Sequence, residues 1–108
     1  MAATSGQQKI MIIFIKENIG TFEKGQVWSG IDLHQRFTSW IKEHPECRKA
    51  KYCIMFPASE YGHRKTKSMF KHFLEETLTL KKNYKTSKYW VKNKDEANRL
   101  NLTIKSLS

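Results

Sequence analysis

The strongest constraint on the fold of this 108-residue chain is an apolar stripe at helical spacing, framed by a start signal and a stop signal. Its members recur at i, i+4, i+7 and i+8, which places them on one face of a helix. Ser29 precedes the stripe and, with Asp32 three residues on, resembles a capping box. Pro45 ends the pattern because the residue before a proline is pushed out of the helical region. The stripe consists of Leu33, Phe37, Trp40 and Ile41.

A second apolar segment precedes it. The run Ile10–Ile15 fits either a helix or a buried strand, because periodicity alone does not separate these two structures. Gly20 is a suitable helix stop, and it favours a helix over residues 8–19. Residues 1–7 are polar or small, and they read as a flexible N-terminal tail.

A third helix is predicted from Thr66 to about Thr79, with Met69, Phe70, Phe73 and Leu74 on its buried side. The segment between the two strong helices, residues 46–64, is read as a connection. It holds a short strand or helical turn at residues 52–56, and Pro57 and Gly62 interrupt it. This connection is longer than those usually found between helices.

A β-hairpin is predicted after the third helix. Residues 78–80 alternate, residues 81–87 form a basic polar turn, and residues 88–92 are rich in strand formers. Tyr89 and Trp90 then lie on opposite faces of the strand. Val27 and Trp28 are expected to pair with another strand, and residues 95–100 to form a short helical segment. Apolar residues near the C-terminus are expected to dock on the core, namely Leu102, Ile104 and Leu107.

Charge points to a polyanionic partner. Lys and Arg number 20 against 10 Asp and Glu, and residues 46–94 hold 13 of these cations with only four acidic residues. A field concentrated in one part of a small domain attracts and orients a polyanion. Nucleic acid is the favoured partner on this ground, with anionic lipid or an acidic protein as alternatives.

The order of elements predicts an α+β, mostly helical fold, a winged helix-turn-helix of about three helices with a C-terminal hairpin. Its domain spans residues 8–93, and residues 94–108 form an extension. A helix fits the major groove of DNA while a hairpin brings lysines to the adjacent backbone. Backbone amides at a helix start near residues 63–65 would add a phosphate site. The residues expected to contact nucleic acid are Arg64, Lys65, Lys67, Ser68, Lys71, Lys82, Lys85, Lys88 and Lys92.

A family resemblance accompanies this pattern. The run Val27–Ile41 resembles the "variable, acidic, Leu/Tyr, two polar, aromatic, polar, polar, Trp" helix of the domain that follows the helicase core in poxvirus- and phage-type primase-helicases. Lys67–Leu74 resembles the second helix of that domain, and Lys88–Lys92 its closing strand. Over residues 10–93 the resemblance implies a winged-helix DNA-binding module. The family's tight connection is replaced here by residues 46–64, and with no ATPase portion in this chain helicase activity is not implied.

A metal site is a weaker hypothesis. His44, Cys47, Cys53 and His63 are candidate zinc ligands, but only the first pair has the spacing usual in structural zinc sites. Two cysteines do not make a disulfide framework, so we expect reduced thiols and no cofactor. Phe37, Trp40, Phe70 and Phe73 are expected in the core rather than in base stacking, because their helical spacing already explains them.

An enzyme is not expected, because the sequence lacks a phosphate-binding loop, a zinc-protease motif and a nucleophile elbow. The carboxylates are also sparse. We expect a sequence-tolerant binder of double-stranded DNA, serving as an accessory module or subunit of a DNA-acting complex. The alternatives are a protein–protein adaptor without nucleic-acid contact, or a binder of RNA or single strands. No apolar run approaches the length of a membrane span, so we expect an intracellular protein, nuclear or cytoplasmic according to its source.

Overall fold

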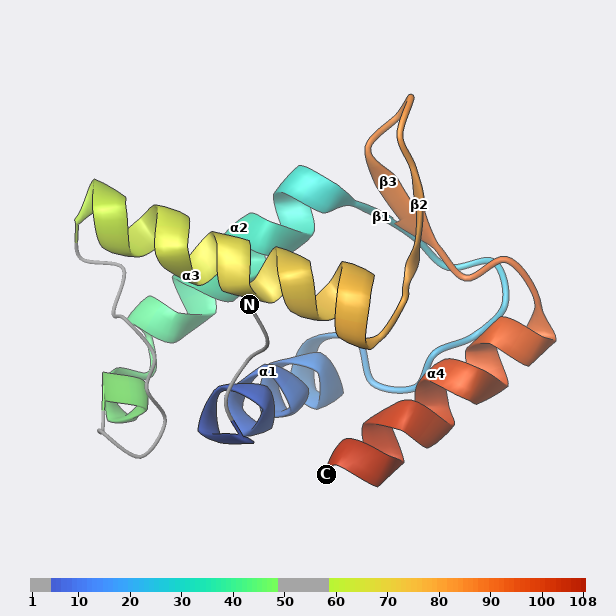
Figure 1. Ribbon diagram of the computed structural model, residues 1–108, viewed down its shortest axis with the longest axis horizontal. Coiled ribbons are helices and arrows are strands. Elements are labelled where there is room, and N and C mark those ends of the chain that lie inside the picture. The colour runs from blue at the N-terminus through green and yellow to red at the C-terminus, as the bar shows by residue number, and fades with distance from the viewer. Residues whose placement is uncertain (1–4, 49–58) are drawn as a thin grey trace.

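The structure of the chain, a computed structural model, describes residues 5–48 and 59–108. The described residues form an α+β domain dominated by helices, as the sequence predicts (Figure 1). The α-helices are α1 (Ser5–Asn18), α2 (Gly30–Lys42), α3 (Glu60–His72) and α4 (Lys94–Leu107), and the strands are β1 (Val27–Ser29), β2 (Lys81–Asn83) and β3 (Lys88–Trp90). A 3-10 helix, η1 (Pro45–Arg48), follows α2, and a π-helical turn, η2 (Phe73–Thr77), continues α3.

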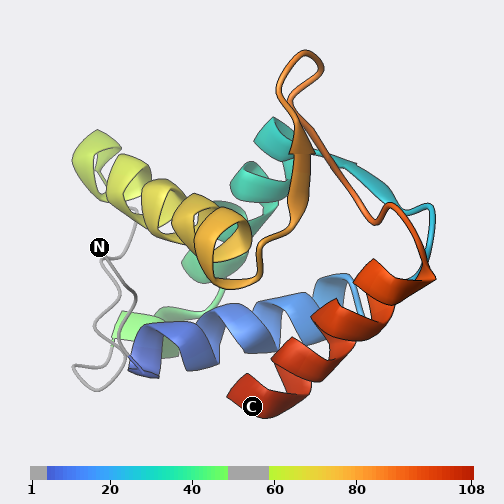
Figure 2. The ribbon, with the colours of Figure 1, turned by 45° about the vertical axis from the view of Figure 1, so that its right-hand side comes forward.

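The three strands make one antiparallel sheet in the order β1-β3-β2. Tyr89 in the central strand lies opposite Trp28 on one side and opposite Lys82 on the other. The expected pairing of residues 27 and 28 with another strand is therefore confirmed. The first strand of the hairpin is Lys81–Asn83, so its expected position at residues 78–80 was wrong, and the turn covers residues 84–87 rather than 81–87. The hairpin of β2 and β3 projects from the helical body in both views (Figures 1 and 2). It is not the C-terminal element, because α4 follows it in the sequence.

The core is organised around the ring of Phe14, where α1, α2 and α3 meet. Phe14 makes edge-to-face contacts with Phe37, Trp40 and Phe70, at centroid distances of 5.1, 5.6 and 5.3 Å. Phe37 also stacks on Phe70 at 4.3 Å. All four rings are buried, and so is Phe73. The predicted core role of these aromatic residues is confirmed, and the three helices are fixed to each other through them.

Helix α1 confirms the helical reading of the apolar run, and it begins at Ser5 rather than at the expected residue 8. The run is nearly continuous because α1 is covered on more than one side, by the other helices and by α4 (Figure 2). Ile10, Met11 and Ile12 are consequently all buried. A helix that is apolar on most of its circumference has no single polar face to reveal its period.

Helix α3 begins six residues before the predicted start. Ser59 caps it, and its hydroxyl accepts a hydrogen bond from the amide of Gly62 at 3.1 Å. Gly62 is buried within the first turn, so reading it as a break was wrong, and so was the expected connection as far as residue 64. The expected strand or helical turn at residues 52–56 lies outside the described residues.

Helix α4 is longer than the short helical segment predicted, and it forms hydrogen bonds with the loop that contains Phe22. The side chain of Asn101 donates to the carbonyl of Phe22 at 3.0 Å and accepts from its amide at 2.8 Å. Ile104 is buried and Leu107 packs against the core, as expected, whereas Leu102 is 66% exposed. Residues 94–107 thus pack on the domain along α1 (Figure 2).

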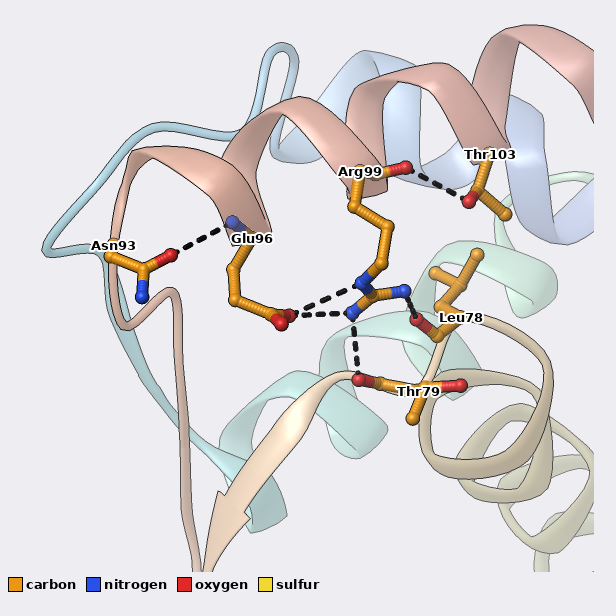
Figure 3. Close-up of polar contacts among 6 residues, drawn as sticks. All are labelled: Leu78, Thr79, Asn93, Glu96, Arg99 and Thr103. Atoms are coloured by element: carbon orange, nitrogen blue, oxygen red, sulfur yellow. Dashed lines mark hydrogen bonds and ion pairs between the residues drawn. The ribbon is translucent and has the colours of Figure 1, made fainter.

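Arg99 of α4 holds the turn between η2 and β2 (Figure 3). Its guanidinium donates to the carbonyl of Leu78 at 2.7 Å and to that of Thr79 at 2.9 Å. The carboxylate of Glu96 accepts two further hydrogen bonds from the same guanidinium, at 3.3 and 2.7 Å. Thr79 has a positive φ of 52°, which is unfavourable for a β-branched residue, so this turn needs support from its neighbours. Arg99 supplies that support where α3 gives way to the hairpin.

Candidate nucleic-acid interface

The solvent-facing side of α3 carries most of the predicted interface. Arg64, Lys65, Ser68 and Lys71 are exposed, and Lys67 is half-buried beside them. From Tyr61 to Leu74 the chain has no acidic residue. Among the described residues, no carboxylate forms an ion pair with any of these four cations. Their charges are therefore available to an external anion.

The first turn of α3 differs from the expected phosphate site. The turn is capped by Ser59 and contains Glu60, whose negative charge is favourable to the helix dipole but opposes an anion. His63, Arg64 and Lys65 lie inside the helix rather than ahead of its start. The phosphate site expected from free backbone amides near residues 63–65 is therefore not at the start of the helix, which lies at Glu60.

The hairpin divides its predicted lysines between two faces of the sheet. Directly opposed residues point to the same face, and successive residues alternate. Lys82, opposite the buried Tyr89, therefore shares the face that packs on the helices, whereas Lys88, next to Tyr89, points to the other face. Lys85 is exposed in the turn between the strands. The hairpin offers cations on both sides and at its tip rather than on one surface.

A buried hydrogen-bonded chain joins the hairpin to α2 and to the end of α3. The hydroxyl of Tyr89 donates to Oε2 of Glu75 at 2.8 Å, and it lies 2.8 Å from Nε2 of His34. Because a phenol has only one hydrogen, Nε2 of His34 carries the proton in this bond and donates it. Lys82 Nζ lies 3.9 Å from the same oxygen of Glu75. Burial, and then the hydrogen bond to Glu75, raises the pKa of the Tyr89 phenol.

The pKa of His34 shows which cations gather around this joint. Burial, and then the charge of Lys67, lowers the pKa of His34 from 6.5 to about 4, with Lys82 and Lys71 lowering it further and Glu75 opposing them. Two cations of α3 and one of β2 thus act on one imidazole. Within the predicted set, Lys67, Lys71 and Lys82 are the members brought together here.

Lys92 lies elsewhere. The hydrogen bond from Arg99 is the main cause that lowers the pKa of Glu96, and the charges of Lys81 and Lys92 contribute to it. Lys92 therefore acts on the first turn of α4, at the base of the hairpin. Lys92 is exposed, and the carboxylate of Glu96 belongs to its charge environment.

One exposed aromatic residue at the hairpin tip was not among the predicted contacts. Tyr84 is 82% exposed and is flanked by Asn83 and Lys85. The sequence carried a signal for it, because a tyrosine within the polar run of residues 81–87 has no apolar neighbour to bury it. Tyr89 and Trp90 were expected on opposite faces of their strand, and their burial agrees with this: Tyr89 is fully buried and Trp90 is half-buried.

The tip is tied to the start of α2. The amide of Gly30 donates to the carbonyl of Ser87 at 2.9 Å, and a Cβ at Gly30 would lie 2.8 Å from that oxygen. Ser87 has a φ of 55°, which turns the chain from the tip into β3. Only glycine admits this approach of two backbones.

The candidate zinc residues do not form a cluster in the described part of the chain. His44 stacks on Trp40 at 4.0 Å, and its Nδ1 donates to the carbonyl of Trp40 at 2.6 Å. Cys47 is buried, and burial raises the pKa of its thiol. Cys53 lies outside the described residues. Within residues 5–48 and 59–108 no group of three or more potential metal ligands is found together.

No helix in the described residues is long and apolar enough to cross a membrane. Comparisons with protein-family models, with curated proteins and with solved structures gave no match to this chain.

Proposed function

We propose that this chain is a winged helix-turn-helix module that binds double-stranded DNA through the exposed face of α3 and the neighbouring hairpin. The order α1, α2, basic α3 and hairpin supports this fold assignment. The contact between Gly30 and Ser87 supports it further, because it sets the hairpin beside the helix pair. As in the primase-helicase domain that the sequence resembles, the module would serve a larger DNA-acting complex.

The observation that carries the proposal is the surface of α3 after Glu60, which has no acidic residue and whose cations form no ion pair with a described carboxylate. Ser68 lies between Arg64 and Lys71 on the exposed side, one helical turn from each. A helix in the major groove would direct Ser68 to base edges and the two cations to the flanking phosphates. Phosphate contacts would dominate, so we propose binding that tolerates many sequences.

The hairpin would provide a second contact. Lys85 at the tip and Lys88 on the outer face of β3 are exposed and would reach the backbone next to the groove that α3 occupies. Lys82 has a different role in this proposal. Its side chain lies against Glu75, so it would hold the hairpin against α3 rather than contact DNA. We propose a binding role rather than catalysis, because the acidic residues near α3 are Glu60 before this surface and Glu75 and Glu76 after it.

A salt titration tests the proposal. The affinity for a duplex of random sequence should fall linearly on a log–log plot as salt rises, because each neutralised phosphate releases counterions. Neutralising Arg64 and Lys71 to Gln should lower the slope of this plot by roughly two, at about 0.9 for each lost phosphate contact. The matched control neutralises Lys9 and Lys16 to Gln, since both are exposed on α1. That control should retain the slope.

Two results would overturn the proposal. Equal changes of slope in the two double variants would mean diffuse attraction rather than a surface centred on α3. Absence of duplex binding even at low salt would leave the adaptor role. Tighter binding of RNA or of a single strand than of duplex in the same titration would replace the proposed ligand.

A further inference from the structure

The hairpin tip presents one large aromatic side chain to solvent. Tyr84 is the most exposed of the large hydrophobic residues in the described part of the chain, at 82%, and it opens the turn between β2 and β3. The hairpin projects away from the helices in both views (Figures 1 and 2). An aromatic ring at the end of such a projection gains nothing from the core of its own domain. The ring is therefore accessible to a ligand from solvent.

The tip is ordered by its own hydrogen bonds. The side chain of Asn83 accepts a hydrogen bond from the amide of Lys85 at 3.0 Å, which shapes the turn just after Tyr84. At the far end of the turn, the carbonyl of Ser87 accepts from Gly30 at 2.9 Å. Tyr84 thus stands on a turn that is fixed on both sides. Because the backbone of the turn is already ordered, less backbone entropy is lost when the tip binds a ligand.

One cation lies over the ring of Tyr84, and another follows it in the sequence. Lys82 Nζ lies 5.8 Å from the centroid of the Tyr84 ring, and Lys85 follows next in the sequence. An exposed ring next to an exposed lysine has the composition of a platform for nucleic-acid bases, where Lys85 would hold a phosphate and the ring would stack on a base. Inside a continuous duplex, however, neighbouring base pairs cover the faces of every base. A stacking platform needs a base that is unpaired or unstacked.

We infer that Tyr84 stacks on an unpaired base, so that the module prefers the junction between duplex and single strand over continuous duplex. This inference rests on the proposed function, since α3 would hold the duplex while the tip meets the base beyond its end. Stacking of one base on one aromatic ring is typically strong enough to change affinity about fivefold or more. The ligand is thus a DNA end or junction that carries a free base.

Three probes test the inference. The first is a duplex of about two helical turns whose ends are closed by linkers without bases. The second is the same duplex with a short overhang of unpaired adenines, and the third has an overhang of equal length built from abasic residues. The abasic overhang carries the same phosphates without a base to stack on. The protein should bind the adenine overhang about fivefold or more tighter than the other two probes.

Substitutions then assign the preference to the ring. Tyr84→Ala should remove the preference and leave the affinity for closed duplex unchanged, whereas Tyr84→Phe should keep both. Tyr61→Ala is the matched control, because Tyr61 is also exposed, at 54%, and has Lys65 at 5.5 Å from its ring centroid. That variant should keep the preference.

The outcomes separate the two proposals. Equal affinity for adenine and abasic overhangs, or loss of the preference in Tyr61→Ala as well, would overturn the stacking role and leave duplex binding intact. No binding to the closed duplex would overturn the proposed function itself.

Discussion

Nε2 of His34 and the hydroxyl of Tyr89 lie 2.8 Å apart in the interior, 55 residues apart in the sequence. Through this bond α2 is joined to the central strand of the sheet, and the same hydroxyl continues to Glu75 at the end of α3. The angle between the proposed recognition helix and the hairpin therefore depends on polar groups as well as on apolar packing. Buried polar chains of this kind are costly when one member is removed.

Removing the hydroxyl of Tyr89 tests that dependence. Tyr89→Phe leaves the Nε2 proton of His34 without its acceptor and Glu75 without its donor, so we expect a loss of about 1–3 kcal/mol in the free energy of unfolding. Urea denaturation measures it. Tyr84→Phe removes a hydroxyl from an exposed ring and should change stability by less than about 0.5 kcal/mol. Equal stability of the two variants would contradict the role given to the buried bond.

Acid should destabilise the fold through His34. Its pKa is lowered to about 4 in the folded protein, against 6.5 when free, so between these values the unfolded chain takes up a proton that the folded chain does not. The contribution of His34 to the free energy of unfolding is therefore fully present above about pH 6.5 and is lost as the pH falls toward 4. The total loss is on the order of 3 kcal/mol. Unfolding of the wild type and of His34→Gln across this range measures the effect. Parallel curves for the two proteins would exclude it.

Gly30→Ala should destabilise the domain although alanine is the better helix former. Propensity alone would favour alanine by roughly 1 kcal/mol within a helix. The added Cβ, however, would lie 2.8 Å from the carbonyl oxygen of Ser87, which is backbone and cannot swing aside. We expect a lower melting temperature and weaker DNA binding, since the hairpin must shift. A melting temperature above that of the wild type would show that the contact is easily relieved.

Arg99→Met should cost about 1–3 kcal/mol, because the carbonyls of Leu78 and Thr79 both lose a charged donor. Arg99→Lys should recover little of this, since an ammonium cannot reproduce the planar fork of donors that reaches both carbonyls. Lys105→Met is the control, an equal loss of charge at an exposed position of α4. Thermal unfolding of the three variants measures the costs. If Lys105→Met lowered stability by a similar amount, the effect of Arg99→Met would come from the loss of one positive charge rather than from the hydrogen bonds.

Helix α2 was predictable because its signals are local. Ser29, the stripe from Leu33 to Ile41 and Pro45 lie within 17 residues, and the structure places the cap bond from the amide of Asp32 to Ser29 at 3.3 Å. Strand β1 was anticipated for the same reason, from Val27 and Trp28. In both places the local preference and the tertiary packing agree.

The start of α3 was missed because a glycine in a first turn looks like a break. The amide of Gly62 is held by Ser59, so the glycine is accommodated where its flexibility costs least. The full length of α4 was missed because its buried side is narrow, with Ala97, Leu100 and Ile104 among polar residues. A signal was present in Asn93, whose side chain accepts from the amide of Glu96 at 2.9 Å.

The candidate site was predictable in composition and not in arrangement. Charge counting identified the cations of α3, and the structure brings Lys67 and Lys71 together with Lys82 near His34. Counting charges could not place Lys82 on the inner face of the sheet and Lys88 on the outer face. That placement depends on the pairing register of strands that are only three residues long. Tyr84 was missed although its place in the polar run of residues 81–87 was a signal for its exposure, because the prediction considered only the cations of that run.

The hydrogen bonds from Arg99 to the turn after η2 also determine how far the chain can be shortened. A version ending at residue 93 would keep every proposed DNA contact. It would, however, lose the hydrogen bond from Arg99 to the turn at Thr79 and the one from Asn101 to the loop at Phe22. Such a fragment would gain conformational freedom where the hairpin departs from the helices. We therefore expect the smallest fragment that folds by itself to extend through residue 107, although the last helix touches none of the surface proposed for DNA.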